Sequence, residues 1–385
     1  MAIKVALKEL CTIEITDGTH KTPEYSDQGY IFLSSKNVTS EKIDWKNVMY
    51  IPESLHQELY QRLAPQKDDI LLAKNGTTGV AAIVDRDEVF DIYVSLALIR
   101  PNQKKVIPRY LLYAINSDST KRYFRSHLKG VGVPNLHLIH IRETPINVPN
   151  IQAQLQIVKK LDKVSDLIAK RRQQLDKLDT LVKARFVEMF GDINVNNKGW
   201  AIQPLGELCT IVRGGSPRPI EKFLGGDVPW IKIGDATDGE SIYLHSTKEH
   251  IIREGVSKSR MVKAESLIFA NCGVSLGFAR IITFDGCIHD GWLAMEDIDA
   301  RLDKVFLLQA LNQMTEHFRK IAPAGTQPNL NTSIMKTYKQ IIPPMKLQKD
   351  FIAFIEQVDK SKLTIQRSCK ALETLKKSLM QHYFG

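Results

Sequence analysis

The chain has 385 residues, of which 43% are hydrophobic and 25% are charged, and this length allows two or three domains that each bury a core. No stretch approaches the roughly 20 consecutive apolar residues of a membrane span, and nothing at the N-terminus is typical of a signal peptide, so we expect a cytoplasmic protein. The formal net charge of +10 favours a polyanionic partner, because cations that neutralise phosphates release bound counterions.

The first part of the chain, residues 1–149, contains short apolar runs separated by Gly, Asn and Pro, which predicts strands and turns. One segment, "RYLLYAINSDSTKRYFRSHL" (109–128), has helical spacing instead. We therefore predict a compact, strand-rich α+β module with a buried helix. The apolar runs are "GYIFLSS" (29–35), "DILLAK" (69–74), "VAAIV" (80–84) and "YVSLALI" (93–99).

A long helix follows this module. Residues 150–190 contain no Gly or Pro, and apolar residues repeat every seven positions, which is typical of a helix that needs a partner helix. Gly191 stands where a C-terminal cap belongs. The heptad positions are Leu161, Ile168, Leu175, Val182 and Met189.

The second half of the chain repeats the first. "LKELCTI" (7–13) aligns with "LGELCTI" (205–211), and "GYIFLSSKNVT" (29–39) aligns with "DVPWIKIGDAT" (227–237) at the same offset. Because chance matches would not preserve the order of elements, the chain is an internal duplication. The later matches pair "KDDILLAKNGTTG" (67–79) with "AESLIFANCGVSLG" (264–277), "VPNLHLIHI" (133–141) with "QPNLNTSIM" (327–335), and "EMFG" (188–191) with "HYFG" (382–385).

A second long helix closes the chain, with heptad residues Phe351, Val358, Ile365, Leu372 and Leu379. Since the two helices follow two similar modules, we expect them to pair antiparallel about an approximate twofold axis. Each would be about 60 Å long, which exceeds one turn of B-DNA. The pair would hold the modules a fixed distance apart. The predicted boundaries are 1–149 for the first module, 150–191 for the central helix, 192–200 for a linker, 201–343 for the second module and 344–385 for the C-terminal helix.

This organisation resembles the specificity subunit of type I restriction-modification systems. The resemblance covers essentially the whole chain and is carried by a module, a "PNL" tripeptide, a "PxxxxQ" motif that opens a long helix, and a final "FG", each present twice. It implies two target recognition domains that each read one half of a bipartite DNA sequence. It also implies helices that set the spacer and dock two DNA adenine methyltransferase subunits, which recruit restriction subunits.

The resemblance further implies that the chain is not itself an enzyme and holds no cofactor, since S-adenosylmethionine, ATP and Mg²⁺ belong to the partner subunits. The sequence is consistent with this, because it has no GxGxxG, no "NPPY"-like run and no phosphate loop. Five scattered cysteines form no CxxC pair, and a strand at "HLIH" would place His137 and His140 on opposite faces, so we expect no metal.

Candidate DNA-reading residues come from matched loops that differ between the halves, since each half would read different bases. Three loop pairs carry the Arg, Lys, Asn, Ser and Thr side chains that suit base edges: "TDGTHK" with "RGGSPR", "SSKN" with "KIGD", and "KNGTTG" with "NCGVSLG". Asn75-Gly76 additionally predicts a two-residue hairpin turn.

The candidates in the first half are Thr19, His20, Lys21, Ser35, Lys36, Asn37, Lys74, Asn75, Thr77 and Thr78. Those in the second half are Arg213, Ser216, Arg218, Lys232, Asp235, Asn271, Ser275 and Gln327.

Two other classes of function stay open on sequence grounds. The first is a self-contained methyltransferase or nuclease of unfamiliar pattern, for which "DDILLAK" (68–74) is the nearest catalytic-looking stretch. Its structural interpretation is a turn ending at Asp69 that leads into a buried strand. The second is a coiled-coil scaffold whose basic charge is incidental.

Overall fold

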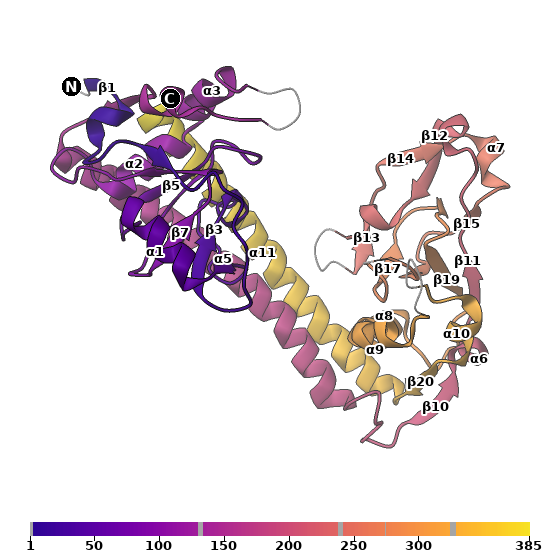
Figure 1. Ribbon diagram of the computed structural model, residues 1–385. Helices are drawn as coiled ribbons and strands as arrows, with labels where there is room; N and C mark the ends of the chain where they lie inside the picture. The colour runs from indigo at the N-terminus through magenta and orange to yellow at the C-terminus, as the bar shows by residue number, and fades with distance from the viewer. Residues whose placement is uncertain (1–2, 130–133, 238–241, 274, 324–328) are drawn as a thin grey trace. The chain divides into compact units, whose positions relative to one another are not determined.

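The computed structural model describes residues 3–129, 134–237, 242–273, 275–323 and 329–385 (Figure 1). The chain divides into two compact units, residues 1–172 with 367–385 and residues 173–366. Each unit combines one strand-rich module with part of both long helices, so the predicted α+β class with two modules and two long helices is confirmed.

The first unit builds three small sheets, in the orders β1-β9, β2-β8-β5-β6 and β4-β3-β7. Most neighbouring strands are antiparallel, but β3 pairs with β7 in parallel. The strands are β1 (Ile3–Ala6), β2 (Thr16–Asp17), β3 (Tyr30–Leu33), β4 (Met49–Ile51), β5 (Ile70–Ala73), β6 (Ala81–Ile83), β7 (Phe90–Ile92), β8 (Leu96–Ile99) and β9 (Pro145–Val148). The helices are η1 (Leu7–Leu10), η2 (Ser35–Asn37), α1 (Glu53–Arg62), α2 (Pro108–Asn116), α3 (Asp118–Ser126) and α4 (Leu138–Arg142).

The second unit repeats this plan with sheets β10-β20, β11-β19-β16-β17-β13 and β14-β12-β18-β15, and here β12 and β18 are the matching parallel pair. The strands are β10 (Ala201–Pro204), β11 (Thr210–Arg213), β12 (Leu224–Ile231), β13 (Tyr243–Leu244), β14 (Glu249–Ile251), β15 (Arg260–Val262), β16 (Leu267–Ala270), β17 (Ala279–Ile282), β18 (Gly286–Ile288), β19 (Trp292–Glu296) and β20 (Lys339–Ile342). The helices are α6 (Leu205–Leu208), η3 (Ile220–Lys222), η4 (Ile233–Asp235), α7 (Arg253–Val256), α8 (Lys304–Gln313), α9 (Thr315–Ile321) and α10 (Thr332–Thr337).

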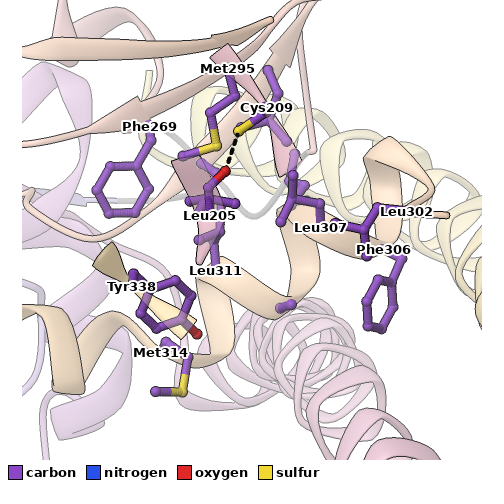
Figure 2. Close-up of a cluster of buried hydrophobic side chains, with 14 of the residues drawn as sticks. Leu205, Cys209, Phe269, Met295, Leu302, Phe306, Leu307, Leu311, Met314 and Tyr338 are labelled. Carbon is purple, nitrogen blue, oxygen red and sulfur yellow. Dashed lines mark hydrogen bonds between the residues drawn. The ribbon is translucent and has the colours of Figure 1, made fainter. Parts of the chain in front are cut away.

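The repeated segment, "LKELCTI" (7–13) and "LGELCTI" (205–211), belongs to the scaffold of both units. Leu7 and Leu205 open η1 and α6 and are fully buried. The thiols of Cys11 and Cys209 donate to the carbonyl oxygens of Leu7 and Leu205, at 3.3 and 3.4 Å. Figure 2 shows the second of these contacts within the core of the second unit, where Leu205 and Cys209 lie near Met295.

The long helices are α5 (Ile151–Phe190) and α11 (Met345–Phe384), and they lie side by side within each unit (Figure 1). In the first unit Arg172 pairs with Glu373 at 2.7 Å, while Phe384 reaches the cluster that contains Leu161. As residue numbers rise along α5, the residue numbers of the contacted positions in α11 fall, so the two helices run antiparallel. In the second unit the ring of Phe186 contacts that of Phe351 in the same sense, with centroids 5.4 Å apart. None of the ten predicted heptad residues is exposed.

The helix that the spacing predicts over 109–128 is two helices, α2 and α3, which break at Ser117. Ser117 has an extended backbone conformation, and its hydroxyl accepts the N–H of Thr120, as an N-cap residue does. The second unit breaks its segment in the same place, between α8 and α9. Apolar periodicity passes through this break because both helices bury a face in one core.

Two local predictions are wrong. The predicted two-residue turn at Asn75-Gly76 is part of a longer connection, since β5 ends at Ala73 and β6 begins at Ala81. The backbone of Asn75 instead forms a bridge with Asn135, which draws the connection away from a tight hairpin. His137 and His140 are not on a strand, because α4 covers that stretch.

Candidate nucleic-acid interface

The three candidate loops of the first unit converge on the connection between β7 and β8. The N–H of Val94 in this connection donates to the carbonyl of Thr19 at 3.0 Å. Its neighbour Ser95 contacts both other loops: the hydroxyl accepts from the N–H of Ser35 at 2.9 Å, and the carbonyl accepts from the N–H of Lys74 at 2.9 Å. Loops from distant parts of the sequence thus form one surface.

The second unit assembles its candidate loops on the matching connection between β18 and β19. The N–H of Asn271 donates to the carbonyl of Gly291 at 3.0 Å, and the N–H of His289 donates to the carbonyl of Ile231, directly before the second loop. The first loop is joined by Gly215, whose N–H donates to the carbonyl of Ile288 at 3.0 Å. The β7–β8 and β18–β19 connections were not among the sequence candidates.

Close backbone approach explains the glycine that follows the opening strand in the first loop of each unit. A Cβ atom at Gly18 would lie 1.9 Å from the carbonyl oxygen of Ile92, and one at Gly214 would lie 2.1 Å from that of His289. Such distances exclude any side chain, so glycine lets the loop pack directly on the central connection. This shared constraint was a signal that the sequence offered, since both loops contain the glycine.

The candidate residues differ in how much of each side chain is available to a ligand. Those exposed are His20, Lys21, Lys36, Thr77, Arg213 and Arg218. Those half-buried are Ser35, Asn75, Thr78, Ser216, Lys232, Asp235 and Ser275. Those buried are Thr19, Asn37, Lys74 and Asn271, and Gln327 lies outside the described residues.

The side chains of three buried candidates make polar contacts within the module itself. The ammonium of Lys74 lies 3.1 Å from a carboxylate oxygen of Asp17, with both side chains less than one-tenth exposed. The amide of Asn271 donates to the carbonyl of Leu330 at 3.2 Å. Asn37 accepts the N–H of Ser34 at 2.9 Å and so caps η2. These contacts favour a structural role for the three side chains.

The charge arrangement on the converging loops differs between the units. Asp17 of the first unit lies opposite Ala97 in the β2–β8 pair, and Arg213 of the second unit lies opposite Leu293 at the same place in the β11–β19 pair. Where the first unit buries a carboxylate against Lys74, the second therefore exposes a guanidinium. The two surfaces offer different charge to a ligand.

A carboxylate organises the second surface from its central connection. The Asp290 side chain accepts the hydroxyl of Ser216 at 2.9 Å and lies 3.5 Å from the guanidinium of Arg218. Arg213 donates to the Asp290 carbonyl at 3.2 Å. The ring of His289 is adjacent, and burial lowers the pKa of this histidine, while the negative charge of Asp290 opposes that shift.

The catalytic-looking stretch "DDILLAK" is structural. Asp69 accepts two hydrogen bonds from Arg100, at 2.8 and 2.7 Å, and β5 behind it is entirely buried. Among the described residues, no group of three or more His, Cys, Asp and Glu side chains could hold a metal ion. In the same part of the chain, no helix combines the length and apolar character needed to cross a membrane.

Comparison with known protein families gives a match over most of the chain. The family model described as "Type I restriction modification DNA specificity domain" matches twice, at residues 3–179 and 197–375. The chain is 22% identical over 366 residues to the putative type I restriction enzyme MjaX specificity subunit of Methanocaldococcus jannaschii, covering 91% of this chain and 85% of that one. It is 19% identical over 380 residues to the StySPI specificity subunit of Salmonella potsdam, covering 93% and 81%.

Two solved structures share the fold. The S subunit of a type I restriction-modification system from M. genitalium aligns with a TM-score of 0.54 at 15% identity, covering 100% of this chain and 96% of that chain. A chain from a study of complex assembly and conformational transition of the type I R-M system aligns with a TM-score of 0.59 at 19% identity, covering 100% and 97%.

Proposed function

Because the chain belongs to the type I restriction-modification DNA specificity family, we propose that its first module reads one half of a bipartite DNA target and its second module reads the other. The chain is a non-catalytic specificity subunit, and the chemistry belongs to other subunits. The two-module proposal is supported by the pair of equivalent loop surfaces. Each surface is built on the matching connection of its own module, β7–β8 or β18–β19, but the exposed side chains differ.

The proposed reading residues are the candidates whose side chains reach solvent. Arg and Lys suit guanine or phosphate, whereas Thr and Ser suit several base edges. The exposed set is His20, Lys21, Lys36 and Thr77 in the first module, and Arg213 and Arg218 in the second. The half-buried candidates would contribute through their polar tips.

The proposed assembly follows from the same family membership. Two DNA adenine methyltransferase subunits would dock on α5 and α11, and restriction subunits would join through them. S-adenosylmethionine, ATP and Mg²⁺ would bind those subunits, and the complex would work on cytoplasmic DNA. We place the module boundaries at 1–149 and 201–343, the helices at 150–191 and 344–385, and the linker at 192–200.

The proposed function is tested by mapping DNA methylation in cells that express the chain with its methyltransferase. We expect methylated adenines within an asymmetric sequence of two short specified parts and an unspecified spacer. A continuous motif, or no motif, would contradict the proposal. If the purified chain alone transferred methyl groups from S-adenosylmethionine to DNA, it would be an enzyme instead.

Salt dependence separates this function from a scaffold whose positive charge is incidental. A protein that neutralises several phosphates releases counterions on binding, so its affinity for DNA falls by orders of magnitude when salt rises from about 50 to 200 mM. We expect this response for the assembled complex on its target, and a flat response would favour the scaffold.

A further inference from the structure

The Asp290 carboxylate holds together the exposed end of the second module's first loop. One of its oxygens accepts the Ser216 hydroxyl at 2.9 Å, and the other lies 3.5 Å from Nη2 of Arg218. The hydroxyl of Ser216 also lies 3.5 Å from the backbone N–H of Asp290, so the two residues contact each other twice. The loop is further tied by Ser259, whose hydroxyl donates to the carbonyl of Gly215 at 2.8 Å.

We propose that Asp290 is a positioning residue for reading the second half of the DNA target, because it sets the place of Ser216 and Arg218 before DNA arrives. This inference rests on the proposed function. Asp290 need not touch a base. It acts through the two side chains that it holds.

The exposure of the ion pair points to this role rather than to stability. The Arg218 side chain is 79% exposed and that of Asp290 is 33% exposed. Ion pairs this open to water add little to folding stability. A long Arg side chain has many rotamers, and restricting them in the free protein reduces the entropy lost on binding. The guanidinium therefore stays accessible while its position is restricted.

The first module has no such carboxylate at the matching position. Val94 lies two residues after Ile92 at the end of β7, as Asp290 lies two residues after Ile288 at the end of β18. The first loop of the first module instead contains Asp17, whose carboxylate is buried against Lys74 and lies 3.2 Å from Nε2 of His20. The effect of removing Asp290 should therefore be confined to the half of the target that the second module reads.

The experiment uses the chain assembled with its methyltransferase subunits and compares Asp290→Asn with the control Asp285→Asn. Both changes remove one negative charge from the same module. Asp285 accepts the N–H of Ala264, which precedes β16, whereas Asn271 follows that strand. The control thus lies at the end of β16 away from the candidate loops. Affinity is measured for the target and for targets with one changed base pair in either half.

A single changed base pair costs a typical DNA-binding protein about 5- to 150-fold in affinity. If the side chains that contact the bases are poorly positioned, this discrimination should fall by about fivefold or more. We expect this loss for Asp290→Asn in the half-site that changes when residues 201–343 are exchanged. Discrimination in the other half and the melting temperature should match those of Asp285→Asn. Asp290→Glu should recover part of the loss, since it restores the carboxylate.

Two results would overturn the positioning role: discrimination by Asp290→Asn equal to that of the control, or an equal loss in both halves. Failure of the proposed function is a separate outcome, because the wild-type complex would then show no discrimination in either half.

Discussion

At the scale of single residues, the duplicated chain uses equivalent positions for different purposes. The backbone N–H of Lys74 bonds to the β7–β8 connection as that of Asn271 bonds to the β18–β19 connection. Their side chains nevertheless differ, since Lys74 neutralises Asp17 whereas the amide of Asn271 bonds to a backbone carbonyl. Each module therefore has its own polar interior beneath a shared backbone arrangement.

The buried Asp17–Lys74 ion pair provides a test of whether the polar interior of the first module supports its fold. Replacing Lys74 with Met leaves the Asp17 carboxylate without its ammonium in a nearly closed site, which should cost about 3 kcal/mol of unfolding free energy. Scanning calorimetry would detect a lower melting temperature for the unfolding of the first unit. Combining Lys74→Met with Asp17→Asn should recover at least half of the loss.

Lys21→Met is the matched control for that change. Its side chain is 83% exposed and lies 3.9 Å from Glu58, so we expect almost no effect on stability. A Lys74→Met protein as stable as the Lys21→Met protein would show that the Asp17–Lys74 pair does not support the fold.

The sequence predicted part of the candidate nucleic-acid interface. Loop composition identified the three segments in each half, because turn residues and polar side chains are visible in the sequence. It could not identify which side chains are buried, since Lys74 meets Asp17 only after β5 and β2 take their places on either side of β8. It also missed Tyr93–Ser95 and His289–Gly291, because many of their bonds to the loops use backbone groups, which leave no mark on residue type.

At the scale of elements, one glutamine at the start of each long helix fastens that helix to its module. The fully buried amide of Gln154 accepts the N–H of Ile107 at 2.8 Å and donates to the carbonyl of Pro149 at 2.8 Å. Gln348 makes the same pair of bonds with Asp303 and Pro343, at 2.8 and 2.7 Å. The "PxxxxQ" motif thus has a physical basis.

Removing this amide should loosen the attachment of α5. Gln154→Ala leaves buried backbone groups without partners, which costs about 2 kcal/mol and should lower the melting temperature by about 4 to 8 °C. Gln152→Ala, at an exposed position two residues earlier on the same helix, should change the melting temperature little. Equal melting temperatures for the two variants would contradict the fastening role.

The long helices were the most predictable elements, because a heptad pattern without Gly or Pro has few alternatives. The break at Ser117, where the serine hydroxyl caps α3, was not predicted, since the apolar spacing continues through it. Strand pairing was also beyond the sequence: nothing local indicates that β3 pairs in parallel with β7 while β5 pairs antiparallel with β8.

At the scale of the whole molecule, we propose that α5 and α11 set the spacer between the two half-sites. Inserting one heptad after Gln173 in α5, and another after Arg367 in α11, keeps the apolar pattern in phase. Seven residues add about 10 Å of helix, which corresponds to about three base pairs of DNA. Methylation mapping should show both half-sites unchanged and the spacer about three base pairs longer.

The same heptad inserted in the linker 192–200 is the control, and it should leave the spacer unchanged. An unchanged spacer in the helix variant would show that the helices do not determine the spacer length.

The central claim, that each module reads its own half of the target, is tested most directly by exchange of one module. Residues 1–149 are replaced by the equivalent module of another specificity subunit, and the methylated sequence is mapped in cells that carry the methyltransferase. We predict that one half of the bipartite sequence changes and the other half stays as it was. A change in both halves, or in neither, would contradict the account.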